Sequence, residues 1–183
     1  MSEARPAAFL DRDGVLNVDH GYVHRLDQLD LIAGAAEAVR LLNEAGFLAI
    51  VVTNQSGVAR GLYGEDDAKR FNTALRQQFA AAGARIDAVY YCPHHPQGTV
   101  ARYAIACGCR KPKPGLLEQA ARDFAIDRTR SFMIGDKDDD REAAAAFGIR
   151  GIKFDAATEQ LVDVTRRAIA ATPDRPAGVS RRE

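Results

Sequence analysis

The chain has 183 residues, of which 46% are hydrophobic and 27% charged, so its size and composition suit one globular domain with a substantial core. Its 25 Lys and Arg residues equal its 25 Asp and Glu residues and are scattered, so we expect no one-sided positive surface for nucleic acid. No apolar run approaches the roughly 20 residues of a membrane span and the N-terminus has no signal-peptide core, so we expect a cytoplasmic protein.

Short apolar runs of β type alternate with longer amphipathic runs along most of the chain. The alternation begins with a strand at residues 7–11, and the further expected strands are at 47–54, 87–92, 131–136 and 151–154. The expected helices are at residues 33–46, 65–82, 115–125, 140–148 and 158–171. Apolar strands separated by helices predict a doubly wound α/β fold, with a parallel sheet covered on both faces. We predict one domain over residues 1–171 and a disordered polar tail over residues 172–183.

Polar residues of the kind that handle phosphate and metal follow three of the expected strands, in FLDRDG, VVTNQSG and MIGDKDDD. In a doubly wound sheet the carboxyl ends of the strands meet at one crevice, where the strand order reverses. We therefore expect side chains that are distant in the sequence to meet there, namely Asp11, Asp13, Thr53, Asn54 and Asp136.

The acidic members of this set indicate phosphate chemistry. Asp11 and Asp13 leave the first strand two residues apart, so both side chains would point to one side, about 6 to 7 Å apart. Together with Asp136 they would repel one another unless a hard cation lay between them, and oxygen ligands favour Mg²⁺. One carboxylate would attack phosphorus, while the second would protonate the leaving alkoxide and then activate water. The Thr53 hydroxyl would hold phosphoryl oxygens, and Lys111 would supply a compensating positive charge.

Other interpretations of these motifs stay open at this point. An Asp-x-Asp pair often caps helix amides, Thr-Asn often forms a turn, and an acidic run is favourable at a helix N-terminus. The acidic run also imitates a calcium loop, but Arg141 and Phe147 stand where that loop requires Gly and Glu. A signalling receiver domain would carry its acidic pair on the first strand and its phosphate acceptor on a middle strand. Here the Asp-x-Asp pair follows the first strand and GDKDDD the fourth, which favours the catalytic interpretation.

All three cysteines lie in one segment, CPHHPQGTVARYAIACGC, over residues 92–109. In a reducing compartment, clustered cysteines are more often metal ligands or catalytic thiols than disulfides. With His95 as an alternative nitrogen, the segment offers four soft ligands for a closed, structural zinc site, namely Cys92, His94, Cys107 and Cys109. A pair of free thiols is the alternative. A closed site would restrict the adjoining Arg110 and Lys111.

The motifs DRDG, TNQSG, RKPKPG and GDKDDD resemble, in this order, the four motifs of the haloacid dehalogenase superfamily of phosphatases. The resemblance implies a Rossmann-like core with Asp11 as nucleophile and Asp13 as general acid and base. It implies Thr53 and Lys111 as residues that stabilise the phosphoryl group, and Mg²⁺ held by Asp11, the Asp13 carbonyl and Asp136. Cap domains in this superfamily follow the first or second motif. Both gaps are too short or too regular here, so we expect no cap domain.

Longer stretches, FLDRDGVLNVDHGYVH, VVTNQSGVARG and CPHHP with CGCRKP, resemble the D-glycero-D-manno-heptose-1,7-bisphosphate 7-phosphatases and, nearly as well, the histidinol-phosphate phosphatases. The first resemblance implies removal of the 7-phosphate from a small sugar bisphosphate, on the way to nucleotide-activated heptose for lipopolysaccharide. It implies that Lys137 lies beside the metal. The implied substrate contacts are Asp19, His20, Gly21, Tyr22, Thr53, Asn54, Gln55, Ser56, Arg110 and Lys111. We expect a monomer, with no nucleic-acid or membrane partner.

Overall fold

The structure of the protein is a computed structural model, and it describes residues 3–174. Its parallel sheet contains β1 (Ala7–Leu10), β2 (Leu48–Asn54), β3 (Ala88–Cys92), β4 (Phe132–Gly135) and β5 (Arg150–Lys153). The strands lie in the order β3-β2-β1-β4-β5, so the chain extends the sheet to one side of β1 and then returns to extend it on the other. The strand order therefore reverses beside β1, where ligand sites of such sheets lie, beyond the carboxyl ends of the strands.

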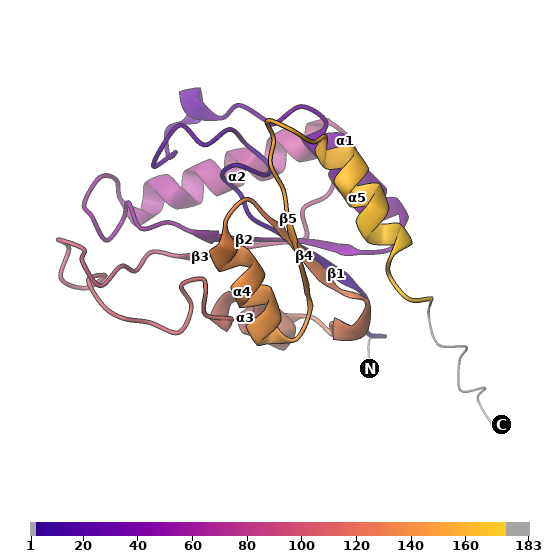
Figure 1. The fold of residues 1–183 in the computed structure, drawn as a ribbon. Helices are drawn as coiled ribbons and strands as arrows, with labels where there is room; N and C mark the ends of the chain where they lie inside the picture. The colour runs from indigo at the N-terminus through magenta and orange to yellow at the C-terminus, as the bar shows by residue number, and fades with distance from the viewer. Residues whose placement is uncertain (1–2, 175–183) are drawn as a thin grey trace.

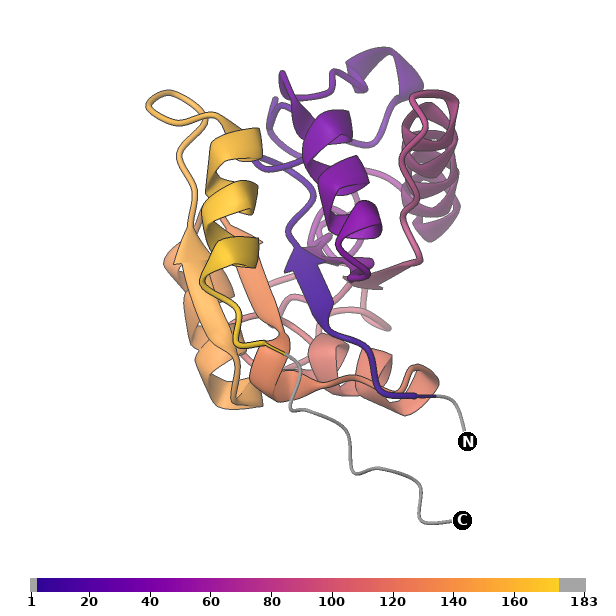
Figure 2. The same cartoon turned by 90° about the vertical axis from the view of Figure 1, so that its right-hand side faces the viewer.

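Helices cover both faces of the sheet. They are α1 (Ala35–Glu44), α2 (Glu65–Ala81), α3 (Gly115–Asp123), α4 (Asp138–Phe147) and α5 (Leu161–Ala170), with short 3₁₀ turns at Leu26–Gln28 and Arg128–Arg130. Figure 1 shows α1, α2 and α5 above the sheet and α3 and α4 below it, and Figure 2 shows the two layers from the side. The predicted doubly wound fold is confirmed.

Alternate residues of β1 supply the two halves of the core. Leu10 belongs to the apolar cluster that contains Phe71 of α2, whereas its neighbour Phe9 belongs to the cluster that contains Phe147 of α4. This division follows from the strand, since successive side chains point to opposite faces. Each of these buried aromatic side chains contributes on the order of 1.5 to 3 kcal/mol by leaving water. Burial on both faces therefore holds the strands in a fixed register, and with them the residues that follow their carboxyl ends.

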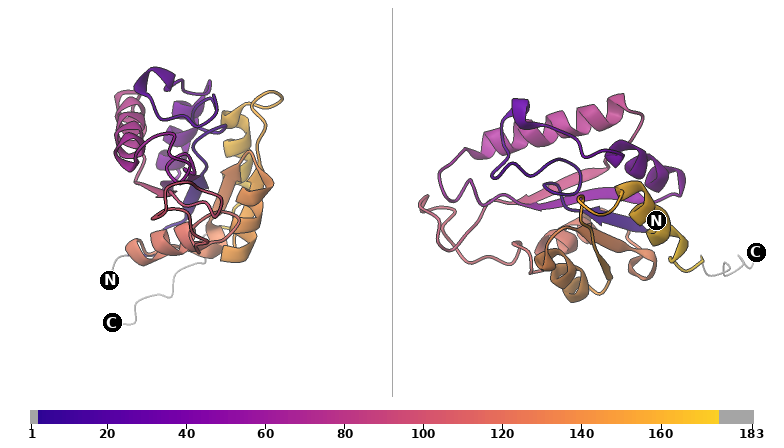
Figure 3. Two further views of the ribbon diagram at one scale, coloured as in Figure 1. Left: turned by 90° about the vertical axis from the view of Figure 1, so that its left-hand side faces the viewer. Right: turned by 45° about the horizontal axis from the view of Figure 1, so that its top comes forward.

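Two long loops extend beyond the carboxyl ends of the strands. One joins β1 to α1 over residues 11–34 and the other joins β3 to α3 over residues 93–114. Figure 3 shows both loops at the same end of the sheet. Among the described residues the first loop contains only the short turn Leu26–Gln28 and the second contains no helix or strand, so the expectation that no cap domain is present is confirmed.

Two further expectations concern the ends of the chain and membranes. In the part of the chain that the structure describes, no helix is long and apolar enough to cross a membrane. Most of the predicted disordered tail, from residue 175 on, lies outside the described residues. The boundary of a single domain at residue 171 stays a prediction.

Candidate active site

A cavity of about 330 Å³ opens at the carboxyl ends of the strands, in the predicted crevice. Its walls come from the segments that follow β1 to β4. The residues that line it are Asp11, Asp13, Asp19, Gly21, Tyr22, Thr53, Asn54, Gln55, Ser56, Tyr63, Arg110, Lys111, Lys137, Asp139 and Asp140. The structure therefore brings together nearly all of the residues that the sequence motifs indicate, although they are spread over more than half of the chain.

A buried lysine lies between two carboxylates at the base of the cavity. Lys111 Nζ lies 2.9 Å from Asp11 Oδ1 and 2.6 Å from Asp140 Oδ1, and the lysine side chain is only 2% exposed. It also donates to the carbonyl oxygen of Val52 at 2.8 Å. Three acceptors thus surround the ammonium group, which has three donors. The lysine is held rigidly, with its charge beside Asp11.

The backbone of Lys111 is held by the end of β2. The side chain of Asn54 accepts from the Lys111 amide at 3.0 Å and donates to the Lys111 carbonyl at 3.1 Å. This pair of hydrogen bonds joins the last residue of the strand to the loop that carries the lysine. Asn54 therefore acts on the site by placing Lys111.

Three carboxylates lie close enough together to share a cation. Oxygen atoms of Asp11, Asp136 and Asp140 lie within 4.8 Å of one another. Asp136 Oδ1 is buried and has no hydrogen-bond partner among the described residues. A methyl group on residue 14 would lie 2.5 Å from Asp136 Oδ2, and residue 14 has a φ of +85°, so only Gly14 allows this approach. An orphaned buried oxygen in a group with net negative charge fits a hard divalent cation.

Burial and charge act against each other in this group. Burial raises the pKa of Asp11 to about 7, and the neighbouring Lys111 opposes the rise without cancelling it. Burial also raises the pKa of Asp136. For Lys111 burial alone would lower the pKa, but the carboxylates of Asp11 and Asp140 outweigh it and raise the pKa. A divalent cation beside these carboxylates would favour their ionised form.

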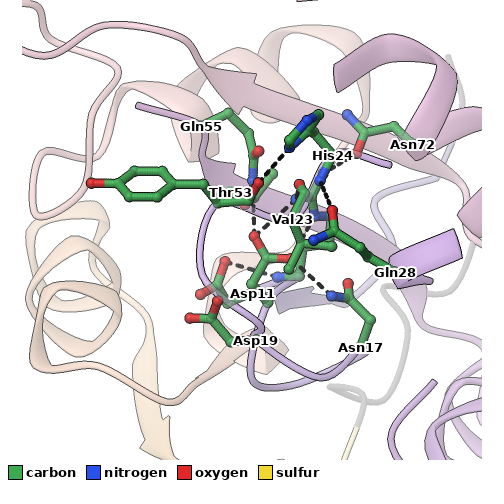
Figure 4. A network of polar contacts seen from close by, with 12 residues as sticks. Asp11, Asn17, Asp19, Val23, His24, Gln28, Thr53, Gln55 and Asn72 are labelled. Carbon is green, nitrogen blue, oxygen red and sulfur yellow. Dashed lines mark hydrogen bonds and ion pairs between the residues drawn. The ribbon is translucent and has the colours of Figure 1, made fainter. Parts of the chain in front are cut away.

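The carboxylate of Asp13 faces a different set of partners. It accepts hydrogen bonds from Arg12, Asn17 and Gln55, and Gln55 also donates to the Thr53 hydroxyl at 2.9 Å. Figure 4 shows Asn17, from the loop after β1, and Thr53 and Gln55, from the end of β2, approaching this region. The Asp13 side chain is outside the acidic group formed by Asp11, Asp136 and Asp140.

The loop after β1 places most of its predicted contacts at the cavity. Asp19, Gly21 and Tyr22 line it, and Tyr22 is 46% exposed with a positive φ of 49°. His20 is different, because its ring lies 2.8 Å from the exposed carboxylate of Asp30 and does not line the cavity. Lys137 lies 3.5 Å from Asp19 and 3.9 Å from Asp136. An ammonium group has no lone pair for a metal, so Lys137 can contribute only charge.

The cysteine segment forms a compact group of one nitrogen and three sulfur atoms. Cys109 Sγ lies 3.2 Å from Cys92 Sγ, 3.3 Å from Cys107 Sγ and 3.4 Å from His94 Nδ1. A disulfide bond would require about 2.05 Å, whereas tetrahedral zinc with Zn–S bonds of about 2.3 Å places sulfurs about 3.8 Å apart. The group therefore fits a closed zinc site. His95 is not part of it, since its ring faces Arg60 at 3.2 Å.

Sequence reasoning missed Asp139, Asp140 and Tyr63, which line the cavity, and Arg12, which binds the Asp13 carboxylate. Asp140 belongs to an acidic run that also suits a solvated helix start, Tyr63 lies in a loop without a motif, and Arg12 separates the two motif aspartates. The available signal for Asp140 was its place in the run after β4. Its side chain accepts from the Lys137 amide at 3.0 Å, which turns it inward at the start of α4.

The parallel sheet, with a carboxylate and a buried lysine at the point where its order reverses, has the features of a phosphoric monoester hydrolase of haloacid dehalogenase type. A family model described as HAD-hydrolase-like matches residues 108–178. A solved structure, the D,D-heptose 1,7-bisphosphate phosphatase from B. bronchiseptica complexed with magnesium and phosphate, superimposes with a TM-score of 0.74 at 27% identity, covering 90% of this chain and 98% of that one.

Curated relatives place the chain more narrowly. The D-glycero-β-D-manno-heptose-1,7-bisphosphate 7-phosphatase of Yersinia pestis is 47% identical over 149 residues, which cover 81% of this chain and 79% of that protein. The enzyme of the same name from Rhodopseudomonas palustris is 44% identical, with 91% and 96% covered. The chain belongs to the family of D-glycero-β-D-manno-heptose-1,7-bisphosphate 7-phosphatases.

Proposed function

We propose that the protein hydrolyses D-glycero-β-D-manno-heptose 1,7-bisphosphate at the 7-position, giving heptose 1-phosphate and inorganic phosphate. The observation that carries this proposal is the pairing of Asp11 with buried Lys111 at the base of a polar cavity, at 2.9 Å. Membership of the family supports the choice of substrate, and the names of the curated relatives support the β anomer.

In the first step Asp11 acts as the nucleophile. An oxygen of its carboxylate attacks phosphorus, the bond between phosphorus and the C7 oxygen breaks, and an aspartyl-phosphate forms. Asp13 gives a proton to the departing alkoxide. Lys111 and the Thr53 hydroxyl stabilise the phosphoryl oxygens, on which negative charge is spread during transfer.

In the second step Asp13 acts in the opposite direction. It takes a proton from water, which attacks the aspartyl-phosphate and restores the Asp11 carboxylate with release of phosphate. The two aspartates have separate partners in the structure, Lys111 for Asp11 and Arg12 for Asp13. This separation of partners supports separate roles for the two carboxylates.

We assign Mg²⁺ to the acidic group. Asp11 and Asp136 would hold it with their carboxylates and Asp13 with its carbonyl, while Asp140 lies near enough to contribute an oxygen or to fix Lys111. When bound, the ion would offset the negative charge of carboxylates and phosphate in one place. The orphaned Asp136 oxygen is the feature of this chain that supports the assignment.

We assign a structural Zn²⁺ to Cys92, His94, Cys107 and Cys109. Four protein ligands complete a tetrahedral site and leave no position for substrate, so the ion would hold the loop in place. Arg110 and Lys111 follow the last ligand directly and line the cavity, so the loop would orient both cations toward the substrate. Thiols kept free for metal suit a reducing compartment, and we place the reaction in the cytoplasm.

The test compares three substrates with one enzyme preparation. We expect kcat/KM for the β anomer of the heptose bisphosphate to exceed that for the α anomer and that for histidinol phosphate, with phosphate released in each case. The Asp11→Asn protein serves as the blank, so that any contaminating phosphatase is recognised. Preference for histidinol phosphate would contradict the substrate assignment, and absence of turnover on all three esters with Mg²⁺ present would contradict the enzyme class.

A further inference from the structure

Arg12 is a charged side chain with no exposed surface, placed between the two aspartates of the first motif. Its Nε lies 2.9 Å from Asp13 Oδ1 and its Nη2 lies 2.9 Å from Asp13 Oδ2. The planar guanidinium group therefore binds both oxygens of the carboxylate at once. A two-point contact of this kind restricts both the position and the plane of the carboxylate, which a single hydrogen bond does not.

The rest of the guanidinium group is anchored to the fold. Nη1 donates to Asn72 Oδ1 of α2 at 2.9 Å, Nη2 donates to the Val23 carbonyl at 2.8 Å, and the group lies 4.4 Å from the centre of the Phe71 ring. A buried charge is costly, and apolar residues of similar volume often serve stability as well or better. The arrangement therefore points to a role in placing Asp13 rather than to packing.

Other donors complete the surroundings of the Asp13 carboxylate. Asn17 Nδ2 donates to Oδ1 at 2.9 Å and Gln55 Nε2 donates to Oδ2 at 3.1 Å. Gln55 is itself fixed, because its Oε1 accepts from the Tyr63 hydroxyl at 2.6 Å. Each carboxylate oxygen thus has one contact to Arg12 and one to a neutral amide. The arginine contacts both oxygens, so its loss should disturb the orientation more than the loss of either amide.

We propose that Arg12 is a positioning residue that aims the Asp13 carboxyl group at the leaving-group oxygen. The inference rests on the proposed function, in which Asp13 gives a proton to the alkoxide as the bond between phosphorus and oxygen breaks. Arg12 keeps its own protons throughout and acts on Asp13 through the two-point contact. A displacement of about 1 Å in such a group can cost on the order of 100-fold in rate.

The test uses two leaving groups. Arg12→Lys keeps a positive charge but cannot form the two-point contact. We measure kcat/KM for the heptose bisphosphate, whose alkoxide needs a proton, and for nitrophenyl phosphate, whose phenolate leaves without one. The value of kcat/KM depends only on the steps up to the first irreversible one, which is the release of the alcohol. It therefore does not include the later hydrolysis of the aspartyl-phosphate. We expect a fall of about 10- to 100-fold with the sugar and less than about 3-fold with the aryl ester.

Two further variants make the result interpretable. Asn72→Ala removes an anchor of Arg12 and leaves its contact with Asp13. We therefore expect a smaller loss of kcat/KM, again larger with the sugar than with the aryl ester. If Arg12→Lys does not fold, this variant tests the inference in its place. Arg128→Lys is the matched control, since Arg128 also stacks on a phenylalanine ring, Phe147 at 3.9 Å, and donates to a carbonyl, away from the cavity. It should leave both substrates unaffected.

Equal losses on both substrates in Arg12→Lys, or no loss on either, would overturn the inference. Asp13→Asn is measured alongside and should show the same dependence on the leaving group, in larger degree. If Asp13→Asn shows no such dependence, the role proposed for Asp13 fails, and the inference fails with it. If Asp13→Asn shows it and Arg12→Lys does not, only the inference fails.

Discussion

Two groups of metal-ligating side chains lie at the same end of the sheet and are built in opposite ways. The acidic group joins Asp11, which follows β1, to Asp136 and Asp140, which follow β4, so it exists only because β1 and β4 pair. The sulfur group takes its four ligands from one stretch of 18 residues, 92–109, most of it in a single loop. The first depends on the whole fold and the second mainly on the local chain.

The groups also differ in what they leave free. Asp11 and Asp140 of the acidic group line the cavity and contact the buried Lys111, and Asp136 Oδ1 has no hydrogen-bond partner in the part of the chain that the structure describes. The sulfur group fits a closed tetrahedron, with no ligand position left for a reactant. We infer that substitution of a side chain in the acidic group should stop phosphate hydrolysis. Substitution of a ligand in the sulfur group should change only the position of the loop over residues 93–114.

The largest effect is expected from Asp11→Asn. The amide cannot form the aspartyl-phosphate, so kcat should fall by at least about 10³-fold. The amide is close in size to the carboxylate, so circular dichroism should show a folded protein. Asp163→Asn, on the exposed side of α5, is the matched control and should keep full activity. Activity near that of the unchanged protein in Asp11→Asn would remove Asp11 from the mechanism.

Lys111→Met should affect both catalysis and stability. Loss of the charge at the phosphoryl group should lower kcat by about 10²- to 10³-fold. It also leaves Asp11 and Asp140 buried without their cation, which should cost roughly 3 to 5 kcal/mol of unfolding free energy. We expect Mg²⁺ to restore part of that loss in a thermal melt, because it binds the folded state. A melting temperature equal to that of the unchanged protein would show that the lysine is not essential to the charge balance.

Cys107→Ala should have a smaller effect on catalysis. Elemental analysis should find zinc in the unchanged protein and little in the variant, with kcat/KM lowered by about 10- to 100-fold. The loss is limited because the loop keeps other attachments, among them Tyr103 to Glu65 of α2 at 2.6 Å and Lys111 to Asn54. Complete loss of turnover in a folded variant would show that the sulfur group takes part in chemistry.

The smallest effect is expected from His95→Ala. His94 Nδ1 lies among the sulfurs and His95 faces Arg60, so zinc should be retained in His95→Ala and lost in His94→Ala. The free energy of unfolding of His95→Ala should stay within about 0.5 kcal/mol of that of the unchanged protein. Loss of zinc in both variants would mean that the second histidine also supports the metal group.

Much of the fold was predictable because the alternation of apolar and amphipathic runs reflects local preference and burial. The predicted strand at residues 47–54 and helix at residues 65–82 agree closely with β2 and α2. The strand order was not predictable, because it depends on hydrogen bonds between segments far apart, such as the pairing of Leu10 with Ile134. Predicting that the motif residues meet needed only a general property of doubly wound sheets.

The remaining part of the site depends on orientation, which the sequence does not encode locally. The start of α4 has the same residue type at three successive positions, Asp138, Asp139 and Asp140. Only the rotation of α4 decides that Asp140 turns toward Lys111. The turn of its loop places His20 against Asp30, so its predicted contact with the substrate stays a prediction. Arg12 could equally have been a surface residue, and only the position of α2 above β1 shows that it is enclosed.

Two hydrogen bonds join the side chain of Asn54 to the backbone of Lys111, at the end of the long loop after β3. The side-chain amide pairs with the peptide unit much as a neighbouring strand would, so the position of Lys111 is fixed by β2 as well as by the loop. The stretch between β3 and Lys111 can therefore change in length or in metal content during evolution while the catalytic cation stays in register.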